Sequence, residues 1–479
     1  MKKWMLLLFA LSLAIGGYGQ AAAQAGERDG RILAEPTIDP RVELVSIVFR
    51  LAGVPEYNQD NFKIYTDAIR AHFDKYKGHP CVAFAKKMWE ENGVGFNAPM
   101  DLAIHVSPAP AFTPLVEFDD KIPEYRWGKK NAGDFLGLLR SFYADAHCEE
   151  FFAQNAPLYK TVLERFRVVY DAVDTRWYRE FYGTAPTGKF VIIVGIGNGG
   201  CNYGSKIVHP DGREDVYATM GTWTVDEGGL PVYTHGYYLS TLIHEFNHSF
   251  INRLNEKHYG ELKASGSAVF EPVGSLMSEQ AYPTPLHALN EALVRAAVVR
   301  YIARHNADPG KAESEMRAQL SNGFIWIDGL VAKLEYYEQH RDRYPTLESF
   351  MPEIAGFYGV TARNLEPLLA RCARVKATVG IENHSAGVSP KISEMKVVFD
   401  KPVQCDDGLA IFTHPEQKKE FPVKKEGTAF SPDRTSLVLA LGLKPDTSYY
   451  FRLPGLRYHT AEGYPLLDYV FEFATGKGA

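Results

Sequence analysis

The motif His244-Glu245-Phe246-Asn247-His248 has the residue types and the spacing of a metal-dependent hydrolytic site. In a helix, residues four apart share one face, so both imidazoles can bind the same ion. Zinc suits imidazole ligands, and a catalytic zinc keeps one position for water. Glu245 is placed to take a proton from that water. The motif therefore predicts Zn²⁺ as the cofactor and Glu245 as the general base.

A catalytic zinc usually has three protein ligands, so a third must be found downstream. Ile251 and Leu254 stand where a His-x-x-Gly-x-x-His continuation would need Gly and His, so that ligand set is excluded. Glu256 and His258 would lie about 12–15 Å further along the same helix and off the metal face, so the nearest remaining candidates are Glu261, Glu271, Glu279 and Glu291. We favour Glu291, because Thr284-Pro285 predicts the start of a largely buried helix, in which this carboxylate needs a partner.

Two residues close to these in the sequence, Arg295 and Asn247, also carry predictions. Arg295 follows Glu291 by four residues and is predicted to orient its carboxylate; a simple helix ion pair is the alternative. Asn247, inside the motif, is expected to face solvent.

The elements that must position the motif can be predicted from periodicity. From Tyr238 to Leu254 no Gly or Pro interrupts an apolar pattern of helical spacing, so the motif lies on a helix. The β-branched run Lys189–Ile196 predicts a buried strand before it. Further strands are expected near Asp215–Thr222 and Leu230–Thr234.

A glycine-rich stretch follows the first of these strands. Gly195, Gly197 and Gly200 match G-x-G-x-x-G, which binds dinucleotides only where a helix begins directly afterwards. Here a loop continues through Cys201–Gly204 toward strand-like residues. We therefore interpret the stretch as a turn between strands.

The 479 residues divide into three unlike parts. Lys2 and Lys3 precede an apolar run and then small residues, so residues 1–24 are predicted to be a signal peptide of an exported, periplasmic or extracellular protein. Residues 40–377 are largely helical with a small mixed sheet. Short β-type runs after Gly380, among them Lys391–Phe399, Leu409–Thr413, Ser436–Leu441, Ser448–Leu453 and Tyr469–Thr475, predict an all-β sandwich over residues 380–479. The predicted fold class is α+β.

Charge and cysteine content exclude several classes of protein. The net charge of −6 gives no basic surplus, so nucleic acid is not an expected partner. No stretch after the signal segment is long and apolar enough to predict a transmembrane span. The five cysteines are scattered and odd in number, so we interpret them mainly as small buried residues.

The metal motif also carries a family resemblance. His244-Glu245-x-x-His248 followed by Asn290-Glu291 on a later helix resembles the gluzincin arrangement, in which a downstream Glu completes the zinc site. The thermolysin-like pattern has an Asp at the place of Arg295. Its spacing between the His-Glu-x-x-His motif and the downstream Glu is shorter than in this chain. The stretch from Val42-Glu43-Leu44 to Asn290–Ala296 looks like a secreted bacterial domain of unassigned function with a zincin-like signature, covering about residues 40–375.

The C-terminal part resembles a bacterial Ig-like domain. The resemblance rests on Phe399-Asp400-Lys401-Pro402, on the Leu443-x-Pro445-x-Thr447-x-Tyr449 stretch and on Phe473-Ala474-Thr475-Gly476. It implies a module that could bind a partner at the cell surface.

Together these resemblances imply a secreted zinc metallopeptidase acting on a peptide or protein substrate. His244, His248 and Glu291 would hold zinc, and Glu245 would deprotonate the attacking water and protonate the leaving amine. Candidate oxyanion donors are His235, Tyr282 and Tyr301. The substrate is expected to add a strand to a sheet edge, for which Asp215–Trp223 is the candidate.

Two other functions remain open. One is a catalytically inactive zincin-like scaffold that binds a surface protein or glycan, and the other is zinc-dependent hydrolysis of a non-peptide amide such as a cell-wall linkage.

Overall fold

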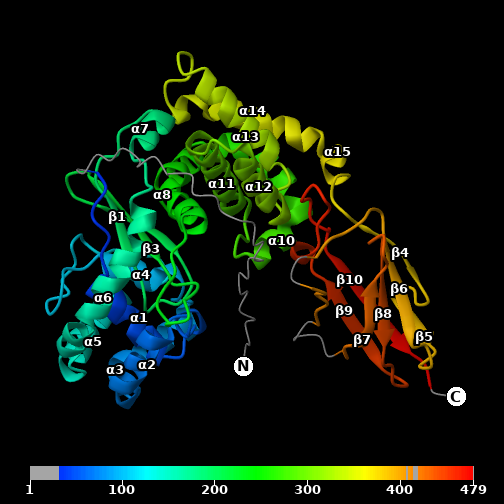
Figure 1. Ribbon diagram of the computed structural model, residues 1–479, viewed down its shortest axis with the longest axis horizontal. Helices are drawn as coiled ribbons and strands as arrows, with labels where there is room; N and C mark the ends of the chain where they lie inside the picture. Colours follow the sequence, from blue (N-terminus) through cyan, green and yellow to red (C-terminus); the bar gives the residue numbers. More distant parts are fainter. Residues whose placement is uncertain (1–31, 406–407, 414–418, 478–479) are drawn as a thin grey trace. The chain divides into compact units, whose positions relative to one another are not determined.

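The computed structural model describes residues 32–405, 408–413 and 419–477 (Figure 1). Helices and small sheets are both present, so the predicted α+β class is confirmed. The chain forms two compact units, one ending at Asn252 and one beginning at Arg253. The predicted signal peptide lies outside the described residues. The predicted domain boundary at residues 377–380 falls inside the second unit and stays a prediction.

Helices are the main regular elements of the first unit. Its helices are α1 (Pro40–Leu51), α2 (Lys63–Phe73), α3 (Pro80–Asn92), α4 (Asn97–Ile104), α5 (Gly128–Asp145), α6 (Cys148–Tyr170) and α7 (Arg176–Tyr182). α1 begins where the Asp39 side chain accepts a hydrogen bond from the Arg41 amide, with Pro40 at the first helical position. It is buried from Val42 to Leu51, so it forms the centre of this unit.

The first unit also contains the small mixed sheet. Its strands are β1 (Phe190–Val194), β2 (Tyr203–Val208) and β3 (Glu214–Met220), in the order β1-β3-β2. β1 and β3 run parallel, while β2 is antiparallel to β3. The strands predicted from Lys189–Ile196 and Asp215–Thr222 are confirmed. The strand predicted at Leu230–Thr234 is wrong, because that segment forms only a single bridge, from Pro231 to Val225.

The order of the strands corrects the expected sheet edge. β3, which contains most of the candidate segment Asp215–Trp223, lies in the middle of the sheet. The outer side of β1 is covered by the N-terminal lead-in, since the amides of Ala34 and Thr37 donate to carbonyls of β1. β2 is therefore the edge strand.

The glycine-rich stretch is a turn between β1 and β2, as predicted. Its amides are held by two side chains: Ile196 N donates to the buried Glu43 carboxylate (2.9 Å) and Gly200 N to Oε1 of the half-buried Gln59 (2.9 Å). Burial raises the pKa of Glu43 to about 7. The next element is a strand and not a helix, which excludes the dinucleotide interpretation.

The second unit contains another group of helices: α9 (Tyr259–Phe270), α10 (Gly274–Glu279), α11 (Pro285–His305), α12 (Pro309–Ser321), α13 (Ile327–Gln339), α14 (Leu347–Arg363) and α15 (Leu365–Leu369). α11 starts as predicted, because the Thr284 side chain accepts from the His287 amide and Pro285 is the first helical residue. It packs against α9, α12 and α13. Nearly every side chain from Ala288 to Val299 is buried.

Two sheets complete the second unit, and we call residues 375–477 the β module. One sheet has the order β4-β6-β8-β7 and the other β5-β10-β9. The strands are β4 (Val375–Val379), β5 (Ser385–Val388), β6 (Glu394–Phe399), β7 (Val423–Phe430), β8 (Ser436–Leu441), β9 (Ser448–Leu453) and β10 (Tyr469–Thr475). Side chains from both sheets form one core. β6, β8, β9 and β10 were predicted, whereas Leu409–Thr413 forms only a bridge from Phe412 to Arg452.

Two simpler expectations can be compared with the described residues. No helix among them is long and apolar enough to cross a membrane. All five cysteines are free thiols, and Cys81, Cys148 and Cys372 are buried as expected.

Candidate metal centre

The two histidines of the motif are carried by α8 (His235–Lys257), which is continuous through the whole motif. Phe246 packs on Phe190 of β1, with ring centroids 4.6 Å apart. Asn247 is fully buried, and its Oδ1 accepts a hydrogen bond from the Tyr182 hydroxyl (2.9 Å), so the expectation that it faces solvent is wrong. These contacts fix one side of α8 and leave His244 and His248 on another.

Glu291 is carried by α11. The end of α8 contacts this helix directly, because Asn255 Nδ2 donates to Asn290 Oδ1 (3.0 Å). Asn255 follows His248 by seven residues, about two turns, so both lie on one face of α8. The histidine-bearing face is therefore directed toward the part of α11 that contains Glu291.

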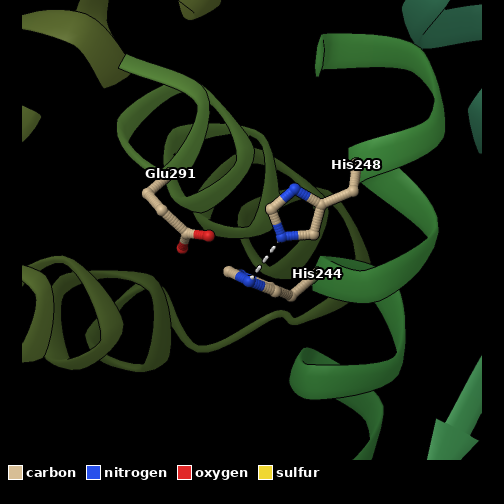
Figure 2. A group of neighbouring side chains, drawn as sticks. All are labelled: His244, His248 and Glu291. Atoms are coloured by element: carbon tan, nitrogen blue, oxygen red, sulfur yellow. Dashed lines mark hydrogen bonds between the residues drawn. The ribbon is translucent and has the colours of Figure 1, made fainter. Parts of the chain in front are cut away.

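The three predicted ligands are brought together. His244, His248 and Glu291 each offer one ligand atom, and these atoms all lie within 4.8 Å of one another. Figure 2 shows the Glu291 carboxylate pointing toward the two imidazole rings. The two Nε2 atoms are 3.1 Å apart. Two nitrogens at 2.0–2.1 Å from a tetrahedral zinc would be separated by about 3.3 Å, so this spacing fits the ion.

Asn252 orients the second histidine and was missed in the sequence. His248 Nδ1 lies 3.2 Å from Asn252 Oδ1, which can accept the Nδ1 proton in the tautomer that leaves Nε2 free to bind a metal ion. The signal that could have revealed it is an amide side chain four residues after a ligand histidine.

Replacing Asn252 with Ala is expected to lower zinc affinity by about tenfold, because the ring loses the partner that fixes its tautomer. Competition with a chromophoric chelator measures this change. Asn252→Asp keeps the acceptor and is the matched control, expected to bind zinc as the wild type does. Equal affinity in Asn252→Ala and the wild type would show that the contact does not support the ligand.

Arg295 contacts Glu291 as predicted. Its Nη2 and Nε lie 3.1 and 3.2 Å from the same carboxylate oxygen, Oε2. Burial alone would lower the pKa of Arg295, but Tyr282 and Glu291 beside it raise that pKa above its usual value. The guanidinium therefore stays charged and holds one side of the carboxylate.

Glu245 lies against the edge strand. A Cβ placed on Gly204 of β2 would be 2.8 Å from Glu245 Oε2 and 3.0 Å from the Glu245 carbonyl oxygen. A side chain at this position would press on the Glu245 carboxylate and its backbone, so Gly204 permits the close approach and is a further residue of the candidate site. A glycine inside a strand pattern is the sequence signal for such a close contact.

The remaining candidates do not join the cluster. Tyr282 contacts Arg295, whose Nη2 donates to its hydroxyl (3.0 Å). His235 and Tyr301 stand nine residues before His244 and ten after Glu291, about 13 and 15 Å along their helices. Tyr301 stacks on His305 with centroids 4.0 Å apart. Neither of these two is placed as an oxyanion donor.

The alternative carboxylates are placed elsewhere. Glu261 lies 3.3 Å from His258 Nδ1. Glu271 is exposed, and Glu279 forms an ion pair with Arg452 of the β module. In the described part of the chain, Glu291 is the carboxylate that groups with the two histidines.

Known proteins give few comparisons. No curated protein matches the chain. The crystal structure of the S-layer protein rSbsC(31-844) is 12% identical, with a TM-score of 0.18, over 76% of this chain and 44% of that one. Domains 1–6 of surface layer protein SbsC are 10% identical, with a TM-score of 0.17, over 83% and 46%. This chain thus spans less than half the length of either, and scores this low assign no fold. The chain belongs to the family described as "Domain of unknown function (DUF4932)", which matches residues 35–356.

Proposed function

We propose that the protein is an exported, zinc-dependent metallopeptidase of the gluzincin type. The observation that carries this proposal is the convergence of His244, His248 and Glu291 within 4.8 Å, beside Glu245 on the same helix turn. Two histidines and a glutamate are a known donor set for catalytic zinc that keeps one position for water. The Nε2 spacing and the Asn252 contact support the fit of these residues to the ion.

The chain's own residues would divide the chemistry as follows. Zinc, when bound, would polarise the scissile carbonyl and the attacking water. Glu245 would accept the proton of that water and pass it to the leaving amine. Arg295 would hold Glu291 in its ligating orientation.

The substrate would lie along β2. An extended peptide can pair with the backbone of an exposed sheet edge, and β2 is the edge strand of the small sheet. Gly204 brings this edge against Glu245, which would place the paired peptide beside the proposed base.

The wider architecture is part of the same proposal. We infer a zincin-like domain over residues 40–377, an Ig-like β-sandwich over 380–479 that could hold a cell-surface partner, and export directed by residues 1–24. The Tyr449 hydroxyl accepts from the Lys444 amide (2.5 Å), a corner contact that favours the Ig-like assignment.

The test is metal content followed by cleavage of mixed peptides. We expect one zinc per chain and cleavage that a chelator stops and added zinc restores. A chain that binds no zinc would contradict the proposal. A chain that binds zinc but cleaves no peptide would favour the surface-binding scaffold, or a non-peptide amide if cell-wall fragments are cut instead.

A further inference from the structure

The β module is attached firmly to the helices of the second unit. Ser321 Oγ, at the end of α12, donates to the carbonyl of Gly463 (3.0 Å), and Tyr464 Oη donates to Asp328 of α13 (3.1 Å). A Cβ on Gly463 would lie 2.6 Å from Arg317 Cγ and 2.9 Å from the Arg317 carbonyl. The turn around Gly463 is therefore seated directly on α12.

The other face of α12 contacts Arg295, the residue that holds Glu291. Arg317 and Ser321 are four residues apart and share a face, whereas Gln319 lies on the opposite side of the helix. Gln319 is buried, at 6% exposure. Its Oε1 accepts from Arg295 Nη1 (2.7 Å), and its Nε2 donates to Glu315 (2.7 Å).

A continuous path thus runs from the β module to Glu291. The Gly463 turn contacts α12, Gln319 of α12 holds Arg295, and Arg295 holds Glu291 Oε2. Phe324 lies under the guanidinium, 5.0 Å from its centre, so Arg295 is confined by a ring as well as by hydrogen bonds.

We infer that the β module sets the position of the metal ligand Glu291 through α12, with Gln319 as a positioning residue. The inference rests on the proposed zinc site. It gives the β module a role inside the protein, beyond attachment to a surface partner. If the contact between the Gly463 turn and α12 shifts, α12 and Gln319 shift with it. Arg295 then no longer holds Glu291 in the same orientation.

The first experiment disturbs the contact between the Gly463 turn and α12 in the full-length protein. Gly463→Ala adds a Cβ against Arg317, at a residue with φ of +98°. Gly387→Ala is the matched control, because it imposes left-handed strain in the same module (φ +70°) with open space around the new Cβ. We expect Gly463→Ala to lower zinc affinity by about tenfold and to change the visible absorption spectrum of bound Co²⁺. We expect neither change in Gly387→Ala.

The second experiment tests the connecting residue. Gln319→Leu is expected to weaken zinc binding by about tenfold and to alter the Co²⁺ spectrum, whereas Glu313→Leu, at an exposed position of the same helix, is expected to change neither. If Gly463→Ala and Gln319→Leu bind zinc and Co²⁺ as the wild type does, the inference is overturned. A wild type that binds neither ion overturns the proposed function, and the inference with it.

Discussion

Glu245→Gln is expected to lower peptide hydrolysis by about 10²–10⁴-fold while leaving zinc content unchanged, since that is the usual contribution of a general base. The glutamine amide has nearly the shape of the carboxylate, so it fits against Gly204, but it cannot accept the proton of the attacking water. The measurement is kcat/KM on a peptide identified from the mixture, together with bound zinc. Loss of activity without loss of metal would separate chemistry from binding.

The control for this variant lies on the same helix. Glu256 is exposed near the end of α8, eight residues beyond His248, and Glu256→Gln makes the same change of charge away from the ligands. It should retain wild-type activity. If Glu245→Gln also retained wild-type rates with zinc bound, another group would have to be the base.

Glu291→Ala is expected to reduce zinc affinity by about 100-fold or more, a loss larger than that from an orienting partner because a ligand itself is removed. The change also leaves the nearly buried Arg295 without its carboxylate, which would destabilise the fold. Glu291→Gln keeps an oxygen for Arg295 and separates the two effects. Zinc affinity from chelator competition and thermal unfolding without metal should be measured on both variants.

Glu271→Ala is the matched control for the third ligand. Glu271 was an alternative ligand in the sequence and is exposed, so its removal should change neither zinc affinity nor unfolding. Normal zinc binding by Glu291→Ala would refute Glu291 as a ligand.

Local patterns were sufficient to predict three residues that the structure brings together, His244, His248 and Glu291. The two histidines are fixed by helical spacing alone, and Thr284-Pro285 marks the start of α11 by capping chemistry that depends on adjacent residues. The prediction of Glu291 combined that start with the expectation of burial, which the structure bears out at 8% exposure. β8, β9 and β10 were predicted with their observed bounds for a similar reason, because each is a compact apolar run between turn residues.

Features that depend on long-range pairing could not be predicted in the same way. β3 follows β2 in the chain yet lies between β2 and β1, so the edge strand depends on a parallel pairing that no local pattern encodes. The role of Gln319 could not be predicted either, because it comes from the packing of α12 on α11 and not from its neighbours in sequence. β7 was missed because its exposed, charged residues lack the alternation of a half-buried strand.

The contact between Gly204 and Glu245 makes the residue at position 204 informative when members of the family are compared. In a relative that keeps His-Glu-x-x-His but carries a side chain at the position of Gly204, the glutamate would have to move from the place that it has here. Such a chain could still bind metal through its two histidines and downstream glutamate. We expect such a chain to hold its glutamate in another position, so the residue at this place in β2 should be compared together with the motif when relatives are examined.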